Sequence, residues 1–217
     1  MMMDYEAAAH KGFLEVYPDV HLSGCYFHLK QSVLRKVAEL GLRQKYREEE
    51  EFNVQVKMMT ALAFVPPEDV ATTFEALSDA FPDEESTDCL LDYFKSTYIE
   101  GPVVRRRQRP PKFPIDMWNH FTDATEKASK TTNCTEGWHN ALHALFQSSH
   151  PGVWKLFDGL RKDIAIQKLV IVKSDTAGEE RPKLQYTKLA ERLQSKVEMY
   201  HQEEDKMKYL RSIAYMT

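Results

Sequence analysis

The sequence is poor in residues that break a chain or cross-link it. Only 8 glycines and 10 prolines occur among the 217 residues, and no tract of low complexity is present, which predicts that most of the chain is ordered. The three cysteines, Cys25, Cys89 and Cys134, are odd in number and far apart, and no secretory signal precedes them. We therefore expect an intracellular protein, nuclear or cytoplasmic, without a disulfide framework.

Long apolar runs and an excess of positive charge are also missing. No apolar segment approaches the roughly 18 residues that a membrane span requires, so we expect no membrane partner. A net charge of −4 is unlike that of a dedicated nucleic-acid-binding domain, so any nucleic-acid contact would be local. One basic segment, "RRRQRPPK", concentrates positive charge in Arg105, Arg106, Arg107, Arg109 and Lys112. A solvated loop, a phosphate contact and a nuclear import signal are all open interpretations of this segment.

Apolar residues recur at helical spacing through most of the chain. Between Tyr46 and about Ile99 the pattern is helical throughout, with a break at Pro66-Pro67, whose rigid φ stops a helix. "KQSVLRKVAELGL" predicts a helix closed by Gly41, and residues 184–216 form an amphipathic tail. Only residues 20–27 carry a strand signal. The chain is thus predicted to be mainly α with about one strand, whose partner strands lie in another chain or have been lost.

The stretch "TTNCTEGWHNALHALF", residues 131–146, concentrates polar side chains on one helix. Asn133 followed three residues later by Glu136 matches a capping box, which accounts for Glu136 without any further role. At about 100° per residue, Glu136, Asn140 and His143 fall on the face opposite Trp138, with His139 at its edge. This polar face lacks Lys and Arg. Solvent exposure is the simple interpretation, and a site that holds a cation is the alternative.

Two other groups of residues could bind a metal. Cys25 and His28, two residues apart, would form half of a zinc site, and His139 with His143 could supply the other half. A buried cysteine and a hydrogen-bonded histidine fit the same pattern equally well. Asp4, just ahead of an expected helix, is an N-cap by default. The same position, after a strand and before a helix, is also where the metal-binding acids of α/β nucleases lie.

Taken together and in order, several segments resemble the transposases of Mutator-like elements (MULEs), which have a ribonuclease-H-like DDE core. The resemblance extends from Asp4 to about Ile171 and rests on "DYEAAAHKGFLEVYPDV", "GCYFHLKQSVLRKVAELGL", "ALAFVPPEDVATTFEAL", "LLDYFKSTYI", "FPIDMWNHF", "TTNCTEGWH" and "HPGVWKLFDGLRKD". It implies that Asp4 is the second catalytic Asp and Glu136 the closing Glu, with Asn133, Trp138 and His139 as supporting residues of the same motif.

The resemblance also implies a chemistry and a division of the chain. Carboxylates of such enzymes hold two Mg²⁺ ions for phosphoryl transfer on DNA, the ancestral partner. A truncated ribonuclease-H-like α/β core would keep about one strand and carry a large all-helical insertion. The expected parts are residues 1–45 as the core remnant, 46–128 as the helical insertion, 129–172 as the Glu-bearing and following helices, and 173–217 as a C-terminal helical tail.

The sequence departs from the family pattern in ways that affect activity. Nothing before Asp4 supplies the first catalytic Asp or the early strands, including the strand that should deliver Asp4, and Thr132 stands where the family has the first of two Asn. We therefore expect the isolated chain to be inactive as a transposase: a fragment, a degenerate element copy or a clipped gene product. A domesticated, non-enzymatic helical module that binds DNA or a protein is the alternative. Oligomerisation through the missing core or the tail helix is also open.

Overall fold

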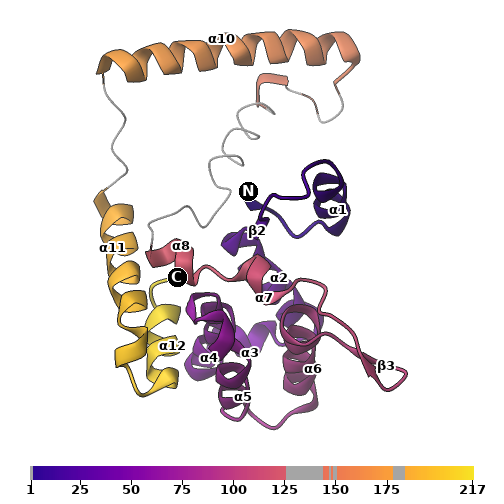
Figure 1. Ribbon diagram of the computed structural model, residues 1–217, viewed down its shortest axis with the longest axis vertical. Helices are drawn as coiled ribbons and strands as arrows, with labels where there is room; N and C mark the ends of the chain where they lie inside the picture. The colour runs from indigo at the N-terminus through magenta and orange to yellow at the C-terminus, as the bar shows by residue number, and fades with distance from the viewer. Residues whose placement is uncertain (1, 126–143, 147, 149–150, 178–183) are drawn as a thin grey trace. The chain divides into compact units, whose positions relative to one another are not determined.

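The computed structural model describes residues 2–125, 144–146, 148, 151–177 and 184–217 (Figure 1). Over these residues the chain is mainly helical, which confirms the prediction of a mainly α chain. Contacts between residues divide the chain into two compact units. The first unit comprises residues 1–131 and 189–217, and the second comprises residues 132–188.

The first unit begins with two short parallel strands joined by a helix. Strand β1 (Met2–Met3) leads into α1 (Ala7–Val16), which leads into β2 (Ser23–Gly24). Met2 pairs with Ser23 and Met3 with Gly24. Strand β2 confirms the strand predicted at residues 20–27, but the prediction that its partner lies in another chain or has been lost is wrong. A strand of two residues is too short to show an alternating pattern, so sequence periodicity could not reveal β1.

A block of helices follows β2 and makes up most of the first unit. These helices are α2 (Tyr26–Glu39), α3 (Arg43–Glu48), α4 (Glu50–Ala61), the 3₁₀ turns η1 (Leu62–Phe64) and η2 (Pro67–Asp69), α5 (Val70–Ser78), α6 (Glu85–Phe94) and the π-helical turn η3 (Lys95–Ile99). As predicted, α2 ends just before Gly41, which adopts a φ of +75° that a side chain would disfavour. Helical structure that starts with α4 also stops before Pro66.

The remaining elements of the first unit complete this block. They are the antiparallel strands β3 (Val103–Val104) and β4 (Arg107–Gln108), then α7 (Ile115–Trp118) and α8 (Phe121–Thr125), and from the C-terminal segment α11 (Leu184–Glu198, in this unit from Leu189), η4 (Tyr200–Gln202) and α12 (Lys206–Ala214). The amphipathic tail is thus interrupted at η4, just before Glu204, where the heptad-like apolar spacing of the sequence is also interrupted.

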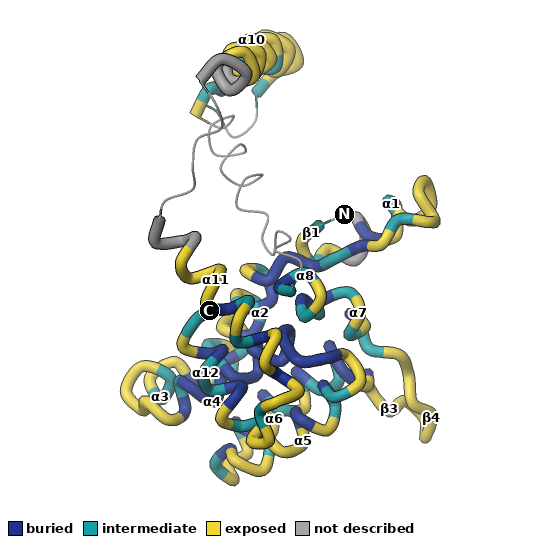
Figure 2. The backbone as a smooth tube through the Cα atoms, turned by 60° about the vertical axis from the view of Figure 1, so that its left-hand side comes forward, coloured by how far each residue is buried: buried dark blue, intermediate teal, exposed yellow. Residues whose placement is uncertain are grey.

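The core of the first unit surrounds α4, which is buried on most of its surface (Figure 2). Helix α12 packs along α4, and the Tyr209 hydroxyl donates to the Phe64 carbonyl over 2.6 Å. Arg211 of α12 also pairs with Glu51 at the start of α4. The C-terminal segment therefore closes the same core that α2, α4 and α5 build.

The second unit contains α10 (Val153–Ala177), a helix of 25 residues. Several of its apolar side chains are exposed, among them Trp154, which is 86% exposed, Phe157 and Ile164. Charged residues interrupt its apolar positions. Within the described part of the chain, no helix combines the length and the apolar character that crossing a membrane requires.

Candidate functional site

Asp4 follows directly after the parallel strand β1. Met3 pairs with Gly24 in the β1–β2 ladder, and the Cys25 amide donates to the Met3 carbonyl over 2.7 Å. The backbone is therefore held up to the residue before Asp4, while the Asp4 side chain is exposed. Sequence patterns predict no strand that delivers Asp4, and Met2–Met3 corrects that prediction. The carboxyl end of a parallel strand is the edge where α/β proteins bind ligands.

Asp4 does not take the N-cap position that its place ahead of a helix suggests. That position belongs to Glu6. Asp4 lies two residues earlier, and its Oδ1 accepts a hydrogen bond from the Glu6 amide over 3.3 Å. The buried His10 donates from Nε2 to the main-chain carbonyl of Asp4. The capping interpretation is therefore wrong, and main-chain contacts hold Asp4 while its carboxylate faces solvent.

Tyr5 anchors the backbone on the other side of Asp4. Its ring packs edge-on against Phe113, with centroids 4.9 Å apart, and against Tyr98 at 6.1 Å. A Cβ atom on Gly24 would lie 2.6 Å from the Tyr5 ring, so the ring fits here because Gly24 has no side chain. Burial raises the pKa of Tyr5 well above its ordinary value, so Tyr5 stays neutral and serves as a packing group. The backbone of Asp4 is thus held on both sides, by Met3 in the strand pair and by the packed ring of Tyr5.

Cys25 and His28 lie at the start of α2. Cys25 occupies the N-cap position and is fully buried, while His28 is half-buried with its ring centroid 5.6 Å from that of Phe27. In the part of the chain that the structure describes, no group of three or more His, Cys, Asp and Glu side chains could hold a metal ion. His139 and His143 fall outside the described residues. The zinc site therefore stays a prediction.

Glu136, the second of the two predicted acids, also falls outside the described residues. The same holds for the motif residues Asn133, Trp138 and His139. The structure therefore locates Asp4 alone, and a site that joins Asp4 to Glu136 stays a prediction.

The basic segment forms a β-hairpin. Val103 pairs with Gln108 and Val104 with Arg107, which leaves Arg105 and Arg106 as the two turn residues. Both have positive φ, 52° and 62°, the pattern of a type I′ turn. Figure 2 shows the hairpin as an exposed element that projects from the helical unit. The interpretation of a simple solvated loop is corrected in one respect: the segment is exposed but regularly folded.

Three contacts hold the base of this hairpin to residues 100–102, the segment that follows η3. The Gln108 side chain donates to the carbonyls of Glu100 and Gly101, the latter over 2.9 Å, and the Arg109 amide donates to the Pro102 carbonyl over 3.0 Å. Gly101 has a φ of +75°, and a Cβ atom on it would lie 2.6 Å from the Pro110 carbonyl oxygen. The hairpin is therefore anchored at its base, and its tip carries two arginines.

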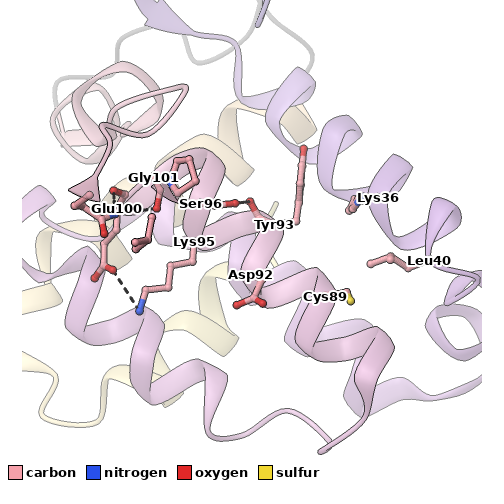
Figure 3. A pocket seen from close by; sticks show the side chains of 12 residues that line it. Lys36, Leu40, Cys89, Asp92, Tyr93, Lys95, Ser96, Glu100 and Gly101 are labelled. Carbon is pink, nitrogen blue, oxygen red and sulfur yellow. Dashed lines mark hydrogen bonds and ion pairs between the residues drawn. The ribbon is translucent and has the colours of Figure 1, made fainter. Parts of the chain in front are cut away.

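A cavity of about 630 Å³ lies beside the hairpin base, lined from α2, α6, η3 and both strands (Figure 3). Lys95 in its wall pairs with Glu100 at 3.3 Å. Lys36 pairs with Glu39 at 3.3 Å and lies over the Tyr93 ring, 5.3 Å from its centroid. Because both lysines have local partners and Asp92 adds a further acid, the cavity has no dominant charge.

The residues that position these features were missed by sequence reasoning. Tyr5, Gly24 and Gln108 act through packing and hydrogen bonds, and no short motif marks them. Gly101, an isolated glycine before two β-branched residues, is the one local signal of a turn into a strand. No family model, curated protein or solved structure matches the chain.

Proposed function

We propose that the chain is part of a MULE-type DDE transposase, with Asp4 and Glu136 as two acids of a phosphoryl-transfer site on DNA. The observation that carries the proposal is the position of Asp4: an exposed carboxylate at the end of a parallel strand, with its flanking residues fixed. The β1–α1–β2 unit, two parallel strands joined by a helix, is consistent with a ribonuclease-H-like core. The resemblance of the ordered motifs adds support.

The chemistry of Asp4 suits a hard cation. Its exposed carboxylate is an oxygen donor, which Mg²⁺ prefers, and its Oδ1 accepts one bond from the Glu6 amide. Asp4 and Glu136 would hold the metal, which when bound activates a water or a DNA 3′-hydroxyl for in-line displacement at phosphorus. The chain's own contribution is to orient Asp4 through the β1–β2 ladder and the Tyr5 ring. Catalysis further needs a third carboxylate, for which these 217 residues offer no assigned candidate.

We expect a weak divalent-cation site that joins Asp4 and Glu136. With Fe²⁺ bound in place of Mg²⁺, hydroxyl-radical chemistry should cut the backbone next to both residues, and excess Mg²⁺ should suppress both cuts. The Asp4→Asn variant should lose both cuts together, because removing one of two ligands abolishes the shared site. Peptide mapping by mass spectrometry measures the result. Cuts at Asp4 that do not depend on Glu136, tested with Glu136→Ala, would contradict a shared site.

A nicking assay on supercoiled plasmid DNA complements this experiment. We expect these 217 residues to show no nicking with Mg²⁺ or Mn²⁺. Nicking that disappears in both Asp4→Asn and Glu136→Ala would keep the site assignment and overturn the proposed inactivity.

The hairpin favours a second function, that of a non-enzymatic DNA-binding module. Its arginines are exposed and have no ion-pair partner among the described residues. The slope of log K against log salt concentration is negative, and each phosphate contact that is lost should reduce its magnitude by about 0.9. Arg105→Ala with Arg106→Ala should therefore weaken binding to duplex DNA and lower this magnitude by about 2, as measured by fluorescence anisotropy at several salt concentrations.

A matched control removes two exposed arginines elsewhere in the same unit. Arg43→Ala with Arg47→Ala on α3 makes the same change in net charge. An equal loss of slope in this control would show that DNA responds to overall charge, and the hairpin would then have no special role.

A further inference from the structure

We infer that the hairpin inserts Arg105 and Arg106 into the minor groove of double-stranded DNA and prefers the narrow groove of A·T-rich sequence. This inference rests on the proposed DNA binding and specifies how the DNA is read. It is carried by the backbone of the turn, the register of the strands and the pairing of the hairpin side chains.

The two turn residues are not of the types that the backbone conformation of this turn favours. Positive φ at both central positions of a two-residue hairpin favours Asn-Gly or Asp-Gly, because a Cβ atom is crowded in this region. This hairpin has Arg-Arg at φ 52° and 62°. Strain of this kind persists where the surrounding structure enforces it and is found at functional sites. Two long cationic side chains at a strained tip therefore indicate that the side chains themselves are needed.

The register of the two strands determines which polar side chains of the hairpin can contact DNA beyond its base, and these are arginines. Val103 and Gln108 share one face and line the cavity beside α6. Gln108, the one amide side chain of the hairpin, is engaged by the carbonyls of Glu100 and Gly101. The opposite face carries the exposed Val104 and Arg107. The tip therefore presents arginine alone, and because arginine also pairs with guanine in the major groove, a comparison of A·T with G·C duplexes separates the two grooves.

The charge of the tip suits the minor groove. Neither Arg105 nor Arg106 has an ion-pair partner within the described ranges. The nearest acid along the chain, Glu100, pairs with Lys95. A narrow A·T minor groove concentrates negative potential and attracts arginine, whose guanidinium loses water more easily than an ammonium group. A two-residue tip is also slim enough to present single side chains to a groove about 6 Å wide.

The test compares two duplexes of equal length, one with an A-tract and one of alternating G·C, by fluorescence anisotropy with the full chain. We expect the A-tract duplex to bind roughly fivefold or more tightly, the lower end of what a well-placed arginine contributes. Arg105→Lys with Arg106→Lys keeps the charge, and should keep the salt slope while the preference falls to within about twofold. Netropsin, which occupies the A·T minor groove, should displace the unmodified chain.

A second variant separates side chains from hairpin geometry. Arg105→Asn with Arg106→Gly supplies the residues that this turn prefers, so the hairpin stays folded while both cations are lost. This variant should lose the A-tract preference, and the magnitude of its slope of log K against log salt concentration should fall by about 2. Tighter binding to the G·C duplex, or no response to netropsin, would overturn minor-groove insertion while DNA binding stands. If the chain binds no DNA at all, both minor-groove insertion and the proposed DNA-binding function are overturned. The metal-site experiment tests Asp4 and Glu136 independently of this result.

Discussion

Replacing Trp118 with alanine is expected to lower the free energy of unfolding by about 3–5 kcal/mol. Trp118 is fully buried, and its Nε1 donates to the Tyr98 carbonyl over 2.9 Å. Its ring packs edge-on against Phe94 and Tyr98, with centroids 5.9 and 6.1 Å apart. Truncation to alanine removes this apolar contact, leaves a cavity and removes the donor for a buried carbonyl. Chemical denaturation followed by circular dichroism at 222 nm measures the change.

The matched control is Trp154→Ala on α10. Trp154 is 86% exposed, so its removal should change the stability by no more than about 0.5 kcal/mol. In a chain of this length, the Trp118 variant should lower the melting temperature by roughly 6–20 °C. A shift as small as that of the Trp154 variant would contradict the central position of Trp118 in the core.

The Trp118 prediction also bears on the proposed active site. Tyr98, which Trp118 contacts, stacks on Phe113 at 5.8 Å, and both rings contact Tyr5. A continuous set of aromatic rings therefore links the helical body to the residue beside Asp4. The helical body of the first unit is thus expected to position Asp4 as well as to stabilise the fold.

Helices were predictable from the sequence because each leaves a repeated signal over many residues. The apolar spacing of α2 and the glycine that follows it locate that helix to within a few residues, and the prolines after Val65 mark the end of the next long helical segment. The break at η4 is marked less sharply, because Tyr200 continues the apolar spacing of the tail, which is interrupted only at Glu204.

Strand β2 lies within residues 20–27, where the sequence predicts a strand, but β1, β3, β4 and the turn between β3 and β4 leave no repeated signal and were not predictable. Strand β1 has two residues, and its partner lies about twenty residues away, so pairing depends on a contact that no local pattern records. The hairpin turn has Arg-Arg where hairpin prediction looks for Asn-Gly. Asp4 stays a predicted site carboxylate, while its capping role failed because tertiary contacts of Tyr5 and His10 place the helix start two residues later.

The hairpin base gives the second large prediction: Gly101→Ala should destabilise the first unit by about 2–5 kcal/mol. A positive φ costs a residue with a Cβ atom roughly 1–2 kcal/mol. At Gly101 the added atom would also press on the backbone of Arg109 and Pro110, and such overpacking typically costs a further 1–3 kcal/mol. Backbone cannot move aside as a flexible side chain can. The stability change is measured by the same denaturation experiment.

Gly41 provides a control with the same backbone and open surroundings. Its φ is also +75°, but a Cβ atom there would meet nothing within 4 Å, so Gly41→Ala should cost only the roughly 1–2 kcal/mol of the conformation. The difference between the two variants isolates the close approach at the hairpin base. Because Gly101→Ala displaces the strands that carry the arginines, it should also weaken DNA binding, whereas Gly41→Ala should leave DNA binding unchanged. Equal stability losses in the two variants would show that the hairpin base yields easily, and a tip on so loose a base could not hold its arginines for insertion.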